Sequence, residues 1–397
     1  MLLSLEVLQA KYGDCLLLHY GVGAAHQVIV IDGGPAGVYK TVLKPRLTAI
    51  KNALSPGQAL PLSMVMVSHM DDDHVNGILA LTQDMLDLEE ENEPVPFNIG
   101  QMWFNTFDDI IGNRQIPHVS SIAASTSAAN LSNIPVIKDA DHSISAVISS
   151  TGQGRQLRNN AAALSAQVNK PFTRRSNQVK LVRGDSNAAP VPWSGGLTIT
   201  VLHPNEQRLV KYEQKWDADL QKALDAGDDS ITIASIVDKD KSPFNLSSIV
   251  CLVELGDKKM LLTGDSRSDD ILEGLRQNNL LDGDGKLHVD ILKLPHHGSV
   301  RNASDNFYQQ VTADHYVVSA NGKYDNPDQA LLDLLVRDVS HATLHFTNKI
   351  NPEFPDLKTK MAAFVQEVGS NGSELSVQFR SDQKTSFVIN LDAPLNI

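Results

Sequence analysis

Cysteine is nearly absent from this chain of 397 residues, which contains only Cys15 and Cys251. Both lie in apolar, strand-like runs, so we interpret them as buried free thiols and exclude a disulfide-rich scaffold. No apolar stretch approaches the length of a membrane span, so we expect no membrane contact. The first residues lack a basic region followed by a long apolar one, and we therefore expect no signal peptide and a cytoplasmic protein.

Basic residues are also scarce relative to acidic ones. The chain has 34 Lys and Arg against 47 Asp and Glu, a formal net charge of −13. This balance does not favour long-lived binding to duplex DNA, which needs a basic face. One basic stretch, from Arg155 to Arg183, contains no acidic residue. It is either an ordinary solvated loop or a local positive lip for an anionic substrate.

The segment 67–77, V-S-H-M-D-D-D-H-V-N-G, is a dense cluster of ionisable residues directly after an apolar run. Four of them are candidate metal ligands: His69, Asp71, Asp73 and His74. So many ionisable groups at the end of a buried strand need neutralisation, and a divalent metal supplies it. Imidazole and carboxylate suit Zn or Mn, with Fe as a third alternative, and the spacing favours two ions. The alternative is an acidic first helical turn, which leaves both histidines unexplained.

Two later segments end in groups of the same kind. Residues 249–254 and 259–262 indicate a hairpin, and Asp265 follows its second strand, where a carboxylate is well placed to bridge two ions. The apolar run 289–294 leads into His296 and His297. Adjacent histidines in an extended chain point to opposite sides, so we expect one to ligate metal and the other to orient groups or act as an acid. We assign His297 to the metal and His296 to catalysis, although the sequence leaves their order open.

Together these motifs resemble the metallo-β-lactamase-fold hydrolases, whose metal loop is usually His-x-His-x-Asp-His and here reads His-x-Asp-x-Asp-His. That variant, with Leu-Thr-Gly-Asp at 262–265 and Leu-Lys-Leu-Pro-His-His-Gly-Ser at 292–299, is similar to the hydrolase domain of the ComEC/Rec2 DNA-uptake proteins. The resemblance implies an α/β fold, an αββα sandwich, formed as a single domain over residues 1–397. Residues 105–192, rich in Ser, Ala and Asn, are expected to be an inserted, partly helical cap.

Apolar periodicity predicts the elements of this sandwich. Strands are expected at 2–9, 14–20, 27–32, 62–67, 98–104, 197–202, 249–263, 288–294, 315–320 and 342–347. Helices are expected at 38–54, 74–91, 205–226, 268–279, 327–337 and 355–368. Residues 374–391 are expected to finish the chain as a hairpin.

The expected chemistry is hydrolysis by a hydroxide activated by two divalent ions about 3.5 to 4 Å apart and bridged by Asp265. Asp73 is the best candidate to orient that hydroxide as well as to ligate. The spare histidine, or Lys293, would stabilise charge or protonate the leaving group. Substrate contacts are expected from Asn245, Lys293, Ser299 and Asn321. Asn245 stands where most relatives have a third histidine, which makes one metal site weak, open or better matched to Mn.

The resemblance favours a phosphodiester substrate, which is a nucleic-acid end, a nucleotide or an anionic small molecule. A neutral ester, lactone or lactam is the alternative within the same fold. From another class comes a non-catalytic sensor or interaction protein whose metal site only stabilises the fold. No residue identifies a protein partner.

Overall fold

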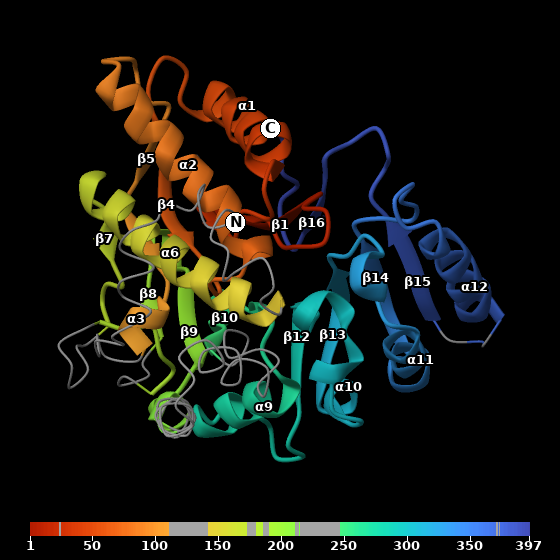
Figure 1. Ribbon diagram of the computed structural model, residues 1–397. Helices are drawn as coiled ribbons and strands as arrows, with labels where there is room; N and C mark the ends of the chain where they lie inside the picture. The colour runs from red at the N-terminus through yellow and green to blue at the C-terminus, as the bar shows by residue number, and fades with distance from the viewer. Residues whose placement is uncertain are drawn as a thin grey trace, which may run out of the picture.

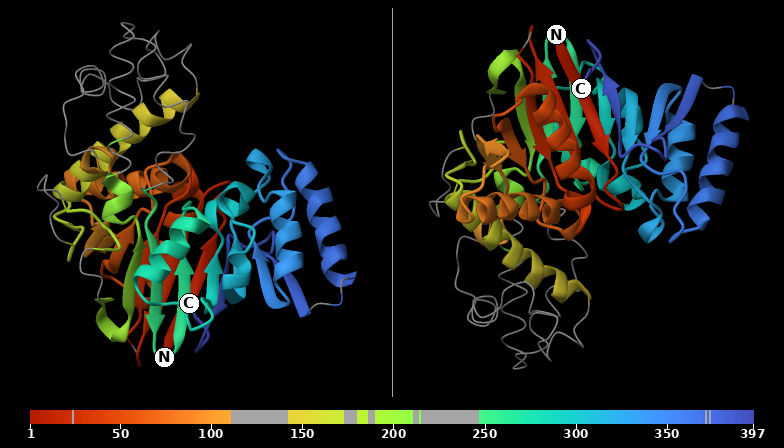
Figure 2. Two further views of the ribbon diagram at one scale, coloured as in Figure 1. Left: turned by 90° about the horizontal axis from the view of Figure 1, so that it is seen from below. Right: turned by 90° about the horizontal axis from the view of Figure 1, so that it is seen from above.

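The computed structural model describes residues 1–23, 25–110, 142–172, 180–185, 190–210, 214, 247–370, 372 and 374–397. In this part of the chain, two eight-stranded sheets pack face to face and helices cover their outer faces (Figures 1 and 2). This arrangement is the predicted αββα sandwich. No described helix is both long enough and apolar enough to cross a membrane.

The first sheet has the order β16-β1-β2-β3-β4-β6-β7, with β5 also paired to β4. Its strands are β1 (Leu2–Leu8), β2 (Leu16–Gly21), β3 (Gln27–Ile31), β4 (Leu60–Met66), β5 (Phe97–Ile99), β6 (Gln101–Trp103), β7 (Gln167–Val168) and β16 (Ser386–Asn390). The second sheet has the order β15-β14-β13-β12-β11-β10-β9-β8. Its strands are β8 (Val191–Pro192), β9 (Thr198–His203), β10 (Val250–Leu255), β11 (Lys258–Leu262), β12 (Leu287–Lys293), β13 (Val311–Val318), β14 (His341–Phe346) and β15 (Glu374–Phe379).

The helices fall into two groups, one for each sheet. On the first sheet lie α1 (Lys44–Leu54), which continues a π-helical turn at Tyr39–Leu43, and α2 (Asp72–Glu90), α3 (Phe107–Ile110) and α6 (His142–Ala163). On the second sheet lie α9 (Ser268–Gln277), α10 (Phe307–Gln310), α11 (Gln329–Asp338) and α12 (Asp356–Ser370). Figure 1 shows α6 running alongside α2.

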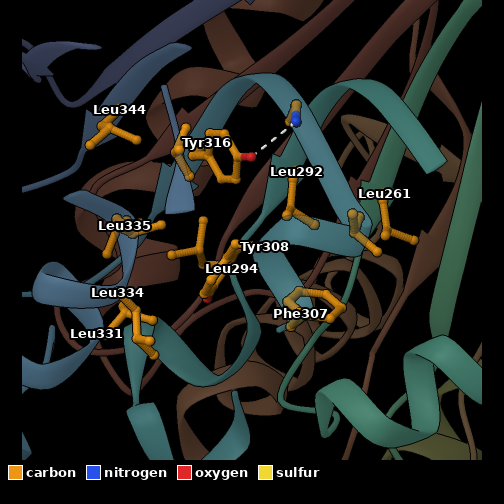
Figure 3. Close-up of a cluster of buried hydrophobic side chains, with 14 of the residues drawn as sticks. Leu261, Leu292, Leu294, Phe307, Tyr308, Tyr316, Leu331, Leu334, Leu335 and Leu344 are labelled. Carbon is orange, nitrogen blue, oxygen red and sulfur yellow. Dashed lines mark hydrogen bonds between the residues drawn. The ribbon is translucent and has the colours of Figure 1, made fainter. Parts of the chain in front are cut away.

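Three apolar clusters correspond to the three interfaces between these layers. Leu81 of α2 belongs to the cluster under the first group of helices. Ile29 of β3 and Ile291 of β12 lie in the cluster between the two sheets. The third cluster lies under α10 and α11, where Figure 3 shows Leu331, Leu334 and Leu335 on one side of Tyr308 and Leu294. The central strands are apolar on both faces because each face is covered by another layer.

One edge of the sandwich collects the ends of several parallel strands. β3 pairs in parallel with β4, and β12 pairs in parallel with both β11 and β13. Parallel strands end at the same edge of a sheet, so the loops after them converge there. The metal loop, Asp265 and the histidine pair all follow strands of this set.

The predicted hairpin at 374–391 is wrong. β15 pairs in parallel with β14 in the second sheet, whereas β16 pairs antiparallel with β1 in the first. The intervening residues 380–385 therefore carry the chain from one sheet to the other. Two strands joined by a polar turn have the same local sequence pattern whether they pair with each other or join different sheets. The pattern alone therefore does not identify the pairing partner.

The proposed insertion at 105–192 joins the sandwich at several points. β7 pairs with β6 in the first sheet, and β8 pairs with β9 in the second. Residues 111–141, 173–179 and 186–189 of this stretch lie outside the described residues. Of the helix expected at 205–226, residues 206–210 and 214 are helical, and the others after 210 lie outside the described residues.

Candidate metal centre

The structure brings the separated motifs together at the strand-end edge. The loop after β4 supplies His69 and Asp71, and the first turn of α2 supplies Asp73 and His74. Asp265 follows β11, and the turn after β12 carries both His296 and His297. Two groups of side chains are close enough to share an ion, with ligand atoms within 4.8 Å of one another: Asp14, His74, Asp265 and His297, and His69, Asp73 and His74.

Asp265 lies between two pairs of imidazoles. Its Oδ1 lies 3.4 Å from His74 Nε2 and 3.5 Å from His297 Nε2. Its Oδ2 lies 3.7 Å from the Nε2 atoms of both His69 and His296. One carboxylate therefore presents one oxygen to each pair, which is the geometry of a bridging ligand.

One further carboxylate accompanies each pair. Asp71 Oδ2 lies 3.7 Å from His69 Nε2, and Asp73 Oδ2 lies 3.3 Å from His297 Nε2. We call the set around Asp265 Oδ2 the first half-site, made of His69, His296 and Asp71. We call the set around Asp265 Oδ1 the second half-site, made of His74, His297 and Asp73. Each half-site thus holds two imidazoles, one carboxylate of its own and one oxygen of the shared Asp265.

The second half-site is oriented through the Nδ1 atoms of its histidines. His74 Nδ1 donates to Asp32 Oδ2 at 2.9 Å, and His297 Nδ1 donates to the Ser319 carbonyl at 3.0 Å. A neutral imidazole that donates from Nδ1 presents an unprotonated Nε2, the form that binds a metal. Both rings therefore aim a ligand nitrogen at Asp265.

The first half-site is oriented in the same way. His69 Nδ1 lies 3.1 Å from Ser68 Oγ, whose own hydroxyl donates to Asp32 Oδ2 at 2.7 Å. His296 Nδ1 donates to Asn302 Oδ1 at 3.0 Å, because the amide nitrogen of Asn302 already donates to the Asp265 carbonyl. Asp32 therefore supports both half-sites, directly in one and through Ser68 in the other.

Three of these residues have left-handed backbone conformations, which residues other than glycine rarely adopt. The φ angles are 58° at Asp32, 48° at His296 and 53° at His297. Such conformations cost about 1 to 3 kcal/mol each and concentrate at functional sites. The expectation that the two histidines point to opposite sides of an extended chain is wrong, because this tight turn aims both Nε2 atoms at Asp265.

Asp14 and Lys293 form a buried ion pair behind the second half-site. Lys293 Nζ lies 2.7 Å from Asp14 Oδ2, and the two side chains are 1% and 2% exposed. The other oxygen of Asp14 lies 3.5 Å from His297 Nδ1. Lys293 also donates to the Leu294 carbonyl at 2.9 Å. The ammonium group therefore supports the centre from within and does not face an incoming substrate.

The electrostatics of the centre suit a cation. Burial, together with the nearby His74, lowers the pKa of His69 to about 3, so this imidazole is neutral. Burial and the carboxylates of Asp73 and Asp265 raise the pKa of Asp71 to about 8. Burial opposes the charged form of His74, but Asp265, Asp32 and Asp73 outweigh it and raise the pKa. Without metal, bound protons offset the repulsion among these carboxylates and imidazoles. A divalent ion would displace those protons and take over the same role.

Two atoms at the centre of the cluster have no hydrogen-bond partner among the described residues. These are His69 Nε2 and Asp265 Oδ1, both buried. Buried polar atoms are rarely left unpaired, and a metal ion would satisfy both. The chemistry of this donor set therefore fits divalent metal.

The residues expected to contact substrate are placed differently. Ser299 Oγ donates to Asp328 Oδ2 at 3.2 Å, and Asn321 Oδ1 accepts from the Lys323 backbone N–H at 3.1 Å. Both side chains therefore stabilise loops at the edge of the centre. Asn245 lies outside the described residues.

The basic stretch beside the centre is largely neutralised in its described part. Arg155 pairs with Asp108 and Arg158 with Asp109. Arg183 pairs with Glu206. These pairs do not form a free positive lip.

Three supporting residues were not assigned to the site from the sequence. Asp14 and Asp32 had only their Gly-Asp and Asp-Gly-Gly turns as signals, and Asn302 had none. The turn before Asp14 requires glycine at position 13, because a Cβ there would lie 1.9 Å from the Asp73 carbonyl oxygen. A small residue before Asp14 lets the metal loop pack directly on this turn.

Comparisons with known proteins give low similarities, and no family model matches the chain. ComE operon protein 3 of Bacillus subtilis (strain 168) is 33% identical over 100 residues, which is 25% of this chain and only 12% of that protein. A solved mutant of CmlA beta-hydroxylase shares 10% identity with a TM-score of 0.37, covering 97% of this chain and 54% of that one. A protein of Parabacteroides distasonis ATCC 8503 described as a metal-dependent hydrolase shares 11% identity with a TM-score of 0.34, covering 88% of this chain and 94% of that one. None of these three names states a substrate.

Proposed function

We propose that this protein is a metal-dependent hydrolase that cleaves a phosphodiester. The observation that carries the proposal is the placement of Asp265, whose two oxygens each face a pair of imidazole Nε2 atoms. Two divalent ions bound there would acidify a water molecule and neutralise charge on the reacting phosphoryl group. Three carboxylates and four imidazoles suit Zn or Mn, with Fe as the third alternative.

Asp73 and His296 are the residues that we assign to proton movement. Asp73 combines a place in the second half-site with a partly exposed side chain, so its carboxylate can orient a nucleophilic water molecule and accept its proton. His296 is 31% exposed, whereas the other three histidines are buried. When Nε2 of His296 carries a proton and does not ligate metal, this imidazole can reach a leaving-group oxygen and donate that proton to it.

Residues behind the histidines hold the imidazole rings in place. Asp32, Ser319 and Asn302 fix the rings of His74, His297 and His296, so that little reorganisation is needed during the reaction. The partly exposed groups of the centre are Asp71, Asp73 and His296, so we expect substrate to approach from their side.

A panel of substrates tests the proposal. The purified protein is loaded with Mn or Zn, its metal content is measured by mass spectrometry, and turnover is assayed with bis-p-nitrophenyl phosphate, linear DNA and nitrocefin. We expect metal-dependent cleavage of the phosphodiesters. Cleavage of nitrocefin alone would support the ester or lactam alternative, and bound metal without turnover would support the non-catalytic alternative.

Asp265→Asn is the decisive variant, and Asp257→Asn is its matched control. The two positions receive the same substitution, but Asp257 lies in the exposed hairpin turn between β10 and β11. We expect Asp265→Asn to lose bound metal and at least about 100-fold in kcat, the scale of a missing metal or acid–base group. Asp257→Asn should match the wild type in both.

His296→Asn separates two roles for that histidine. Unchanged metal content with a lower kcat identifies His296 as the proton donor. Loss of one metal equivalent identifies His296 instead as a ligand of the first half-site. It would then replace the histidine that most relatives have at the position of Asn245.

A further inference from the structure

A short loop after β13 presents an exposed aromatic residue and a cation at the edge of the metal centre. Tyr324 is 73% exposed, the largest value among the exposed large hydrophobic residues of the described chain. Lys323 Nζ lies 3.4 Å from the ring centroid of Tyr12 and 4.8 Å from that of Tyr324. The two tyrosine rings meet edge to face at 6.1 Å. We call Tyr12, Lys323 and Tyr324 the aromatic rim.

The aromatic rim is connected to the second half-site by direct backbone contacts. Tyr12 precedes Gly13 and Asp14, and the Asp14 N–H donates to the Asp73 carbonyl at 3.2 Å. Ser319, whose carbonyl orients His297, donates from its hydroxyl to the Gly13 carbonyl at 2.7 Å. The same Ser319 leads into the loop that carries Lys323 and Tyr324. The Asp73 carboxylate also acts electrostatically on the Tyr12 hydroxyl, so the rim lies beside Asp73.

The loop holds Tyr324 outward in a conformation that costs free energy. Tyr324 and Asp325 have φ angles of 58° and 65°, in the left-handed region. The Asn351 amide donates to the Asn321 carbonyl at 2.9 Å, and Lys360 pairs with Asp325. These contacts stabilise a strained turn that holds the Tyr324 ring in solvent, and such strain concentrates at functional sites.

The charge of the rim is also available for a ligand. No carboxylate pairs with Lys323 among the described residues, and its ammonium instead lies over two aromatic faces. Aromatic faces bind nucleobases by stacking without selecting one base, and a neighbouring lysine attracts the phosphate backbone. A chain with a net charge of −13 otherwise repels such an anion.

We propose that the aromatic rim binds the nucleobase next to the scissile phosphate, so that the substrate is a nucleotidyl phosphodiester. This inference rests on the proposed function and specifies its substrate class. The free nucleotide and the single-stranded nucleic-acid end share the required chemistry, a base one sugar away from the phosphate.

Two substrates with the same leaving group test the proposal. Thymidine 5′-(p-nitrophenyl phosphate) carries a base, whereas methyl p-nitrophenyl phosphate does not. For the thymidine ester, we expect the KM of Tyr324→Leu to be about tenfold higher than that of the wild type, which is the size of one lost stacking contact. Its kcat for that ester, and its kcat/KM for the methyl ester, should not change. Tyr324→Phe keeps the ring and should behave as the wild type.

A binding measurement keeps this test independent of catalysis. The protein is first stripped of metal with a chelator and then titrated calorimetrically with thymidine 5′-monophosphate and with ribose 5-phosphate. We expect the wild type to bind the thymidine nucleotide more tightly than the sugar phosphate, and Tyr324→Leu to bind both equally. If the wild type binds both ligands equally, or if Tyr324→Leu and Tyr324→Phe bind alike, the proposal that the aromatic rim binds the nucleobase is wrong. Absence of turnover by the metal-loaded wild type contradicts the proposed function instead, and the calorimetric result still decides the rim. Oligothymidylate in the same titration distinguishes a nucleic-acid end from a free nucleotide.

Discussion

At the scale of single residues, the centre depends on which nitrogen each histidine presents. All four rings have a partner at Nδ1, and all four aim Nε2 at Asp265. Asp32 is the most influential partner because it binds both His74 and Ser68. The Asp32 carboxylate thus orients residues that would hold an ion, without being placed as a ligand itself.

Replacing Asp32 with Asn should therefore weaken metal binding while preserving the fold. An amide cannot accept the His74 and Ser68 protons as a carboxylate does, and loss of such a supporting group typically costs 10- to 100-fold in metal affinity. We expect about 30-fold, measured by competition with a chromophoric chelator. Asp87→Asn, on the exposed face of α2, is the control and should keep full affinity. Equal affinities in the two variants would contradict the role of Asp32.

The ionisable residues that the structure gathers around Asp265 have a stronger sequence signal than their supports. His69, Asp71, Asp73 and His74 form a dense cluster that has no structural explanation, so the cluster itself is the signal. Asp14 and Asp32 are single carboxylates beside glycine, a pattern that also occurs in ordinary turns. The left-handed turn at the histidine pair has no sequence signal, because non-glycine residues rarely adopt it.

At the scale of elements, the position of α2 determines where two ligands lie. Asp73 and His74 occupy its first turn, so a small displacement of the helix moves both. Gly77, one turn further on, packs against Gly33, and a Cβ at Gly77 would lie 1.9 Å from the Gly33 carbonyl oxygen. The two glycines let the helix start directly against the end of β3.

Gly77→Ala should displace α2 and destabilise the protein. The contact is with backbone, which cannot move aside as a flexible side chain can, so we expect a loss of about 3 kcal/mol in the free energy of unfolding. Urea denaturation of the chelated protein measures it. Gly369→Ala, in α12 with no atom within 4 Å of the added Cβ, should not destabilise the protein and should gain at most about 1 kcal/mol, because alanine favours a helix. Similar values for both variants would show that the close approach does not matter.

Most elements were predictable because their apolar periodicity is strong. β10 and β11 form the expected hairpin around Gly256, and α9 and α11 lie within three residues of their predicted bounds. The crossing after β15 was not predictable, because local pattern cannot tell pairing within one sheet from pairing across two. The long helix expected from 74 to 91 instead begins at Asp72, within the metal loop itself.

At the scale of the whole molecule, a buried charge network joins the two ends of the chain. Glu6 of β1 accepts a hydrogen bond from Arg46 of α1 at 2.8 Å and pairs with His19 of β2 at 3.1 Å. It also accepts from Ser386 of β16, and Arg46 donates to the Ile397 carbonyl at 3.3 Å. The three views of Figures 1 and 2 show the termini close together. The network therefore fixes the last strand against the first.

This network predicts a dependence of stability on pH. Burial raises the pKa of Glu6, but hydrogen bonds from His19 and Arg46 outweigh it and hold the pKa below its ordinary value. A lowered pKa in the folded state stabilises the protein above the pKa of the unfolded chain, and that contribution is lost as the pH falls through the folded value.

We expect Glu6→Gln to lose about 3 kcal/mol at pH 7, the usual cost of breaking a buried pair, and to show a smaller further loss in acid than the wild type. Chemical denaturation from pH 7 to pH 3 measures both. Glu89→Gln, exposed on α2, should follow the wild-type curve. A parallel acid dependence of Glu6→Gln and the wild type would show that Glu6 is not the titrating group.

The central claim is that Asp265 bridges two divalent ions, and electron paramagnetic resonance of the Mn-loaded protein tests it most directly. Two Mn ions that share a carboxylate are exchange-coupled, so we predict a coupled dinuclear signal in the wild type that disappears in Asp265→Asn. A wild-type spectrum of isolated Mn ions at every loading, or no bound Mn at all, would contradict the account.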